Sequence, residues 1–489
     1  MSSFVTNVLK LISGSIVAQA VGILLIPIIS RLYTPDDFGV FQVFLSIAGI
    51  LAIISCFSYQ LAIMLPKEDR DAANLAALST VLVVATSTVS GAVLIIFAES
   101  IAATLSFPAL AGYIGLIPIL VFLNGLFFIL NYWLSRREKF GTVAGGRVAN
   151  SLVNKGVQIG AGIGVASPLG LIAGAVTGYL SANLIMLFEV RKDLALFSSV
   201  TLTRVKALAF RYRKFPIFTS WSTAANEISR QISPIFLAFF FTPTVVGLYS
   251  LAYQVVSLPL SLVGTAVSQV FFQKVSEVRK QTGNIGPIVE EVHRRLVTIS
   301  IFPMLLLLII GEELFVFFLG AQWYDAGFYV KLLVPWLFFM FVSSPLTAIF
   351  NVLEKQGAGL AFELVLLASR AVTLTIGGMS GDPVIAILLF SLTGALFSAF
   401  MNIWLLKLAG LDYVRECYLW CADLLTGVLI TTPLIVAKFL SFSIMLLFAI
   451  AIAVSLIYYG LAVARDPFLK EWVAEFFQGI KRFISQSSR

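Results

Sequence analysis

The segment TPDDFGVF at residues 34–41 has a second copy, TPTVVGLY at residues 242–249, which lies 208 positions later. A further pair, EKFG at 138–141 and EKQG at 354–357, is separated by 216 positions. The members of each pair stand at the same place relative to the apolar runs around them. This arrangement predicts two six-helix halves in parallel orientation. Transporters are often built from such repeats, with the substrate site at the repeat interface.

Apolar residues dominate the chain around these motifs. Of its 489 residues 59% are hydrophobic and 12% are charged, whereas a soluble domain is about 25% charged. A water-soluble fold cannot bury so much apolar surface, so we expect an all-α polytopic membrane protein. A membrane helix needs about 20 apolar residues, and runs of this length predict fourteen spans. They lie near 8–32, 38–64, 74–98, 111–134, 143–166, 169–190, 216–241, 245–272, 295–319, 329–352, 358–380, 383–408, 420–439 and 442–464.

The distribution of basic residues predicts the orientation. With the N-terminus inside, 26 of the 33 lysines and arginines fall in cytoplasmic segments or in the tail and four fall within spans, as the positive-inside rule requires. Only Arg31, Lys331 and Lys438 fall in predicted outer segments. An even number of spans then places both termini in the cytoplasm.

The repeat and the spans together predict four parts. They are an N-terminal six-helix half at 1–200, a C-terminal six-helix half at 201–410, an extra transmembrane hairpin at 411–464 and an amphipathic cytoplasmic tail helix at 465–489. The basic, aromatic-rich loop at 191–215 is typical of an interfacial helix that lies against anionic membrane lipids. Because each basic run adjoins a membrane span, we expect no nucleic-acid partner.

Several charged residues fall inside the predicted spans. A charge at the bilayer centre costs about 2.5–3.5 kcal/mol on insertion scales and by default suggests a function. Those near mid-depth are Lys155, Glu227, Arg230 and Arg370. Arg147 and Glu363 lie closer to the inner face, and the 216-residue offset aligns these two with each other.

Polar residues at helical spacing accompany these charges and predict a hydrated cavity. The expected polar lining is Gln19, Asn154, Gln158, Thr223, Asn226 and Gln231. With Arg31 at the outer end of the first span, the charges have a positive surplus, which favours an anionic ligand. Arginine suits phosphate because its planar guanidinium can bind two oxygens at once. Glu227 and Arg230, three residues apart, could instead form an internal ion pair.

The chain resembles polysaccharide flippases of the Wzx type, in the MOP superfamily that includes MATE exporters and lipid II flippases. The resemblance covers roughly residues 5–410 and rests on RLYTPDDFG at 31–39 and on a second, longer run. That run comprises Phe215, Pro216, Asn226, Pro234, Gly247, Leu248, Tyr249, Pro259, Gln269, Val270 and Phe271. The family implies two six-helix bundles in a V around a cavity that opens alternately to either side. Fourteen spans depart from the twelve of many members.

The resemblance implies a substrate, an undecaprenyl-diphosphate-linked oligosaccharide, which is flipped across the bacterial inner membrane for O-antigen, capsule or exopolysaccharide assembly. A polysaccharide polymerase and a chain-length regulator are the expected protein partners. Arg230, Lys155 and Arg370, with Arg147, would hold the diphosphate-sugar head, and Arg31 would guide it at the outer exit. Glu227 or Glu363 would be the site of H⁺ or Na⁺ coupling.

We expect no catalytic residue, metal or cofactor. The chain has no Walker motif and hence no ATP site. Cys56, Cys417 and Cys421 are best explained by packing, and His293 by a solvated or headgroup-facing position. Three alternatives remain: a lipid II flippase, a MATE-type drug or cation antiporter, and an O-antigen polymerase or ligase. The surplus of basic charge disfavours the antiporter, and the short outer loops disfavour the enzyme.

Overall fold

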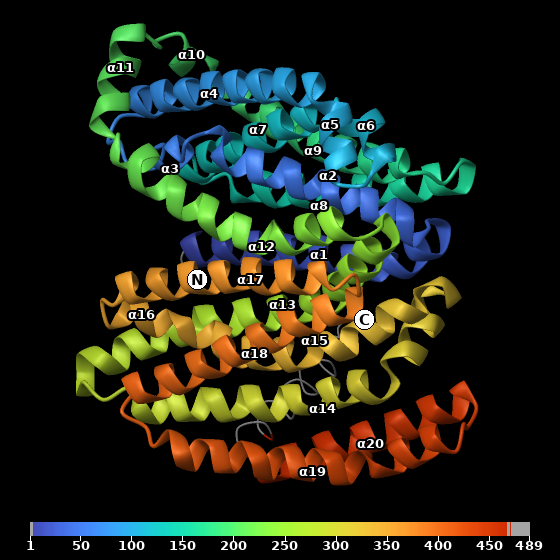
Figure 1. Cartoon of the computed structure of the whole chain (residues 1–489). Coiled ribbons are helices and arrows are strands. Elements are labelled where there is room, and N and C mark those ends of the chain that lie inside the picture. The colour runs from blue at the N-terminus through green and yellow to red at the C-terminus, as the bar shows by residue number, and fades with distance from the viewer. Residues whose placement is uncertain (1–2, 467–469, 471–489) are drawn as a thin grey trace, which may run out of the picture. The chain divides into compact units, whose positions relative to one another are not determined.

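The computed structural model describes residues 3–466 and 470, and this part of the chain is helical throughout (Figure 1). The predicted tail helix at 465–489 lies almost entirely outside the described residues. The principal helices are α1 (Ser3–Leu32), α2 (Pro35–Ser55), α4 (Asp69–Ile96), α7 (Ile117–Arg136), α8 (Phe140–Gly164), α9 (Pro168–Val190), α12 (Ser220–Phe240), α13 (Pro243–Thr282), α14 (Gly286–Leu319), α15 (Tyr324–Ser343), α17 (Gln356–Met379), α18 (Pro383–Leu408), α19 (Tyr413–Phe439) and α20 (Ile444–Arg465). Shorter helices are α3 (Tyr59–Ala62), α5 (Ala98–Thr104), α6 (Pro108–Ile114), α10 (Leu194–Phe197), α11 (Leu202–Arg211) and α16 (Ala348–Val352).

Every predicted span coincides with one of the long helices, so the all-α prediction is confirmed. Eleven helices in the described part are long and apolar enough to cross a membrane. The described apolar part of α1, Val17–Leu32, is shorter, and α8 and α12 do not reach the same hydropathy. These last two helices carry Lys155 and Arg230. The count of fourteen spans stays a prediction.

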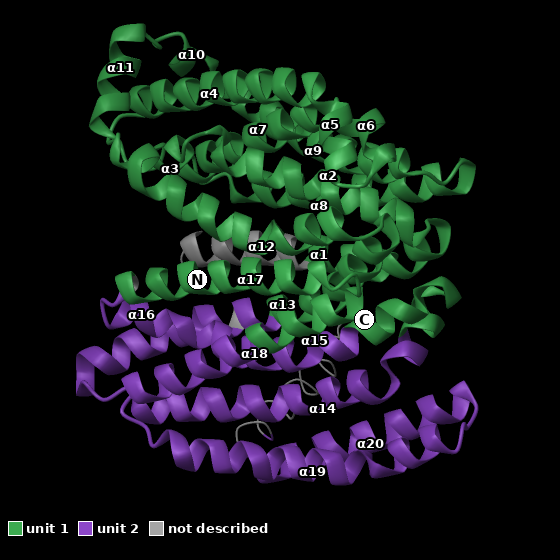
Figure 2. Cartoon of the chain, viewed as in Figure 1, with its two compact units in different colours: residues 1–262, 315–329, 356–393 green, residues 263–314, 330–355, 394–489 purple. Residues whose placement is uncertain are grey.

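The chain forms two compact units, coloured separately in Figure 2. Unit 1 comprises residues 1–262, 315–329 and 356–393. Within it α8 packs between α1 and α9, α2 packs against α7 and α12, and α12 packs against α17. A buried cluster around Trp133 and Cys56 joins α3, α4 and α7 to residues of α8, α9 and α11. The division at residues 200 and 410 predicted from the repeat stays a prediction.

The repeated motif explains how α2 and α13 begin. Thr34 caps α2 by accepting a hydrogen bond from the Asp37 N–H, while the Asp37 carboxylate accepts one from the Thr34 N–H. This capping box, followed by Pro35 at the first helical position, is a strong start signal. Pro243 occupies the matching first position of α13.

The two copies of the motif contact each other within unit 1. A Cβ at Gly39 would overlap the Pro243 carbonyl, and a Cβ at Gly247 would overlap the Pro35 carbonyl. The contact is reciprocal, because each glycine faces the proline of the other copy. The motif therefore requires glycine for close backbone approach rather than for a turn.

Beside this contact, the last turn of α14 and the residues just after it pack against the end of α1. Arg31 donates a hydrogen bond of 2.8 Å to the Phe317 carbonyl. The Trp323 indole donates to the Ser30 carbonyl at 2.7 Å, and Ser30 donates to the Leu319 carbonyl at 3.1 Å. These bonds satisfy carbonyl groups that a helix end leaves open.

Unit 2 comprises residues 263–314, 330–355 and 394–489. In it α14 departs from helical geometry at Ile310, and Lys438 of α19 donates a 2.6 Å hydrogen bond to the carbonyl of Ile309. Glu312 accepts from both Lys331 and Lys438. The two lysines of unit 2 that the sequence placed outside are thus bound by carboxylates.

Candidate functional site

The predicted site residues all lie in unit 1, on α1, α8, α12 and α17. On α8, the Lys155 ammonium donates to the side-chain oxygen of Gln158 at 3.1 Å. Gln158 is 1% exposed and donates in turn to the Leu171 carbonyl near the start of α9 at 3.2 Å. Gln158 therefore fixes Lys155 from the α8–α9 interface. The buried side-chain oxygen of Asn154, one residue before Lys155, has no hydrogen-bond partner in the described part of the chain.

On α12, Glu227 is held toward α2. Its carboxylate accepts a 2.8 Å hydrogen bond from Gln231, whose own oxygen accepts one of 2.9 Å from Ser46 on α2. Gly49 leaves room for this chain, since a Cβ there would lie 3.4 Å from the Glu227 carboxylate. The sequence reasoning missed Ser46, although Gln42 and Ser46 are four residues apart on one helix face.

Arg230 lies next to this chain but extends away from it. Its Nε is 4.0 Å from the Glu227 carboxylate, and its side chain is 73% exposed against 19% for Glu227. Glu227 and Arg230 therefore form the ion pair that the sequence offered as an alternative, at the upper limit of ion-pair distance. It leaves most of the guanidinium accessible.

Arg370 on α17 joins the same region. Its guanidinium donates to the Ser229 hydroxyl at 3.0 Å and lies 5.7 Å from the centre of the Phe390 ring. Tyr253 on α13 lies within electrostatic range of both Arg370 and Arg230. The structure therefore places Arg370 of α17 on Ser229, the residue before Arg230, with a tyrosine that the sequence did not single out in electrostatic range of both cations.

The remaining predicted residues take varied places. Asn226, Glu363 and Gln19 are exposed, and Arg147 is partly buried on α8. Thr223 uses its hydroxyl within α12, donating to the Thr219 carbonyl at 2.9 Å. Arg31 lies at the end of α1 on the Phe317 carbonyl and belongs to a different cluster from Arg230.

Comparison with known proteins places the fold. A family model described as "Polysaccharide biosynthesis protein" matches residues 28–327. No curated protein matches the chain. Among solved structures, the chain is similar to a lipid II flippase, MurJ, in an inward closed conformation. The identity is 11% and the TM-score 0.69, over 94% of this chain and 99% of that one.

Two further structures come from the MOP superfamily. One is a multidrug resistance MATE transporter in an inward-facing conformation, with 12% identity and a TM-score of 0.62 over 81% of this chain and 98% of that one. The other is a transporter from Pyrococcus furiosus whose binding pocket is described as having reverse polarity, with 12% identity and a TM-score of 0.53 over 83% and 95%. At such identities the likeness shows the fold alone. The chain is a multi-pass membrane protein with the MOP fold.

Proposed function

The chain belongs to the family of polysaccharide biosynthesis proteins, and from this premise we propose that it flips an undecaprenyl-diphosphate-linked oligosaccharide across the bacterial inner membrane by alternating access. Its termini are cytoplasmic in this proposal. It acts as a transporter rather than as an enzyme, and a polymerase with a chain-length regulator consumes the flipped repeat unit.

Arg230 is the observation that carries the proposal. It stands at the middle of α12, a helix of 21 residues, and its side chain is 73% exposed. A charge at that depth faces water or a polar ligand rather than lipid. Because Arg370 lies nearby on α17, two guanidinium groups can share one anionic group of high charge. A diphosphate satisfies this requirement and offers several oxygens for bidentate hydrogen bonds.

The other residues take supporting roles. Two further cations stand on α8. Lys155, whose ammonium is held by Gln158, is the third cation of the proposed site, and Arg147 is the fourth. Glu227 is the better candidate for H⁺ or Na⁺ coupling, because its carboxylate is mostly enclosed and contacts both Gln231 and the edge of the Arg230 guanidinium. A change in its charge would alter the field at the diphosphate directly.

A lipid II flippase is the second candidate, because lipid II carries the same undecaprenyl diphosphate. The cations of α12 and α17 recognise the part that both substrates share. A MATE-type antiporter for cations is disfavoured by those same charges. The identity of the sugar therefore separates the first two candidates, and the sign of the ligand charge separates them from the third.

The test is transport of defined lipids by the full chain in proteoliposomes. We expect movement of an undecaprenyl-diphosphate oligosaccharide, measured by access of an external glycosidase, and a loss of about tenfold or more in Arg230→Ala, since hydrogen bonds to charged groups contribute about 1.5–3 kcal/mol each. Lys280→Ala, which removes an exposed charge at the end of α13, is the matched control. Movement of lipid II alone would favour the second candidate, and Arg230→Ala at the wild-type rate would refute the role of this cluster.

A further inference from the structure

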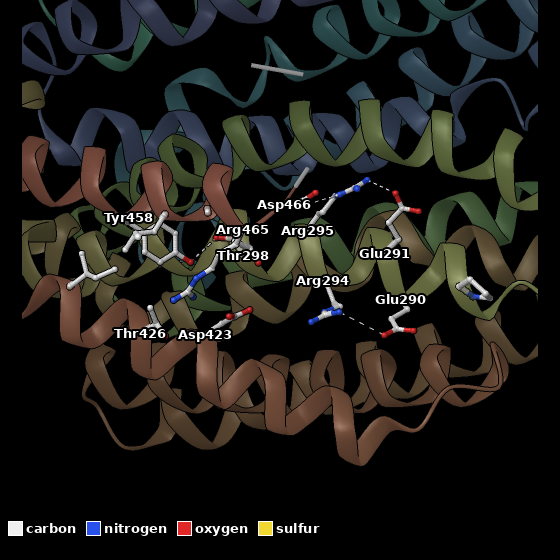
Figure 3. A pocket seen from close by; sticks show the side chains of 14 residues that line it. Glu290, Glu291, Arg294, Arg295, Thr298, Asp423, Thr426, Tyr458, Arg465 and Asp466 are labelled. Atoms are coloured by element: carbon white, nitrogen blue, oxygen red, sulfur yellow. Dashed lines mark hydrogen bonds and ion pairs between the residues drawn. The ribbon is translucent and has the colours of Figure 1, made fainter. Parts of the chain in front are cut away.

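A second charged region lies in unit 2 and shares no residue with the candidate site of unit 1. A cavity of about 470 Å³ opens between α14, α19 and α20, and Figure 3 shows its lining. Three arginines and four carboxylates line it. This mixture differs from the cationic cluster of unit 1, because neither sign of charge dominates.

The predicted spans put the cavity at the edge of the membrane. The charged lining lies around the ends of the predicted apolar runs 295–319, 420–439 and 442–464, on the side that the basic residues predict to be cytoplasmic. The apolar side chains of Ile430 and Leu461 complete the lining. A site at this depth meets lipid headgroups, with acyl chains available along the neighbouring apolar helix surface. On the outside of α19, Leu425 and Leu429 are 61% and 65% exposed.

One arginine of the lining is fully engaged. Arg295 forms ion pairs of 2.7 Å with Glu291 and 3.0 Å with Asp466. Its position explains how the end of α20 is joined to α14. Arg295 therefore has a structural role. The kind of ligand that fits the cavity depends on the remaining charged side chains.

The other charges leave a gap between them. Arg294 is 3.9 Å from Glu290, and its side chain is 49% exposed. The Asp423 carboxylate accepts a hydrogen bond from the Thr298 hydroxyl and attracts both Arg294 and Arg465, yet among the described residues neither arginine comes within ion-pair distance of it. Tyr458 donates its hydroxyl to the Thr298 carbonyl at 2.9 Å, which joins α20 to α14 at the wall of the cavity. Two guanidinium groups and one carboxylate thus face a common space.

We propose that this cavity binds the headgroup of a phosphoethanolamine lipid from the inner leaflet. The lipid phosphate lies between Arg294 and Arg465, and the primary ammonium lies on Asp423. A primary ammonium donates three hydrogen bonds, whereas a quaternary choline donates none. A purely anionic headgroup would satisfy the arginines but would face Asp423 and Glu290 without a cation. The bound lipid joins the α19–α20 hairpin to α14.

The test is native mass spectrometry of the full chain with added lipids, and it needs no transport measurement. We expect the wild type to bind phosphatidylethanolamine about tenfold more tightly than phosphatidylcholine or phosphatidylglycerol, the effect of one charge-assisted hydrogen bond. Asp423→Asn should remove the preference for ethanolamine over choline, and Asp423→Glu should keep it. Arg465→Gln should weaken all three lipids alike.

Arg415→Gln is the matched control, because Arg415 is exposed on α19 and does not line the cavity. Equal binding of the three lipids by the wild type would overturn the proposal, as would an Asp423→Asn variant that behaves like the control. Soluble glycerophosphoethanolamine is the last arm. Competition by this compound at the concentration of the lipid would show a site for a soluble ligand and would also overturn the lipid assignment.

Discussion

Replacing Gly247 by alanine should open the contact between the two copies of the repeated motif. The added Cβ would lie 2.9 Å from the Gly39 nitrogen and closer still to the Pro35 carbonyl. Both neighbours are backbone at the first turn of α2, so no side chain can rotate away, and the starts of α2 and α13 must separate. Overpacking of this kind costs about 1–3 kcal/mol, which reduces the population of the closed contact about 5- to 150-fold.

A disulfide reporter measures that population. In the closed contact the Thr244 hydroxyl donates to the Asp36 carboxylate, so cysteines at these two positions should cross-link rapidly once Cys56, Cys417 and Cys421 are replaced by serine. The Gly247→Ala variant should cross-link at least fivefold more slowly. It should also react faster with a membrane-impermeant maleimide from the outside.

Gly460→Ala is the control for the change in residue type, since nothing lies within 4 Å of a Cβ at Gly460 in α20. Alanine favours a helix over glycine by about 1 kcal/mol, and the control shows that gain without the steric effect. Cross-linking in Gly247→Ala that matches Gly460→Ala would refute the steric reasoning.

Three further outcomes follow from individual contacts. Lys438→Met should lower the free energy of unfolding in detergent by about 1–3 kcal/mol, measured by thermal unfolding, because it leaves buried acceptors on α14 without a donor. Arg204→Ala removes the 2.6 Å pair with Asp71 that holds α11 on α4. Hydrogen exchange at 202–211 should then rise, because α11 loses this link to α4. Arg230→Ala should keep or raise the thermal stability while it lowers transport, and a clear loss of stability would contradict the role given to Arg230.

The sequence predicted the helices well because the lipid environment leaves few alternatives. Backbone groups in hydrocarbon must bond within their own segment, so an apolar run of sufficient length becomes a helix whatever its partners are. The structure departs from the predicted spans at helix ends, where water and neighbouring segments compete for the backbone hydrogen-bonding groups. The run predicted at 38–64, for example, ends its main helix at Ser55 and continues as the short helix α3, after Phe57 and Ser58 adopt positive φ.

The candidate site was less predictable, because a helical stripe does not reveal which neighbour each side chain meets. Gln158 lies on the same polar helix face as Lys155. It is nevertheless buried against α9, and its side-chain oxygen accepts a hydrogen bond from the lysine. Ser229 and Tyr253 carry no charge, and only the packing of α17 and α13 against α12 gives them a role. The glycines of the motif were found as a repeated pattern, whereas their reciprocal contact depends on long-range geometry that no local pattern encodes.

The balance of charge in unit 1 singles out one position. Lys155 has Gln158 at 3.1 Å, Arg370 has Ser229 at 3.0 Å and Arg31 has a carbonyl at 2.8 Å. Each of these partners offsets part of the cost of a charge in the membrane. Arg230 has Glu227 at 4.0 Å and is mostly exposed, so its guanidinium keeps more donor groups accessible to a ligand than these three cations do. In the proposed transport cycle, phosphate oxygens of the substrate would accept hydrogen bonds from these donors, and charge-assisted bonds of this kind favour an anionic ligand.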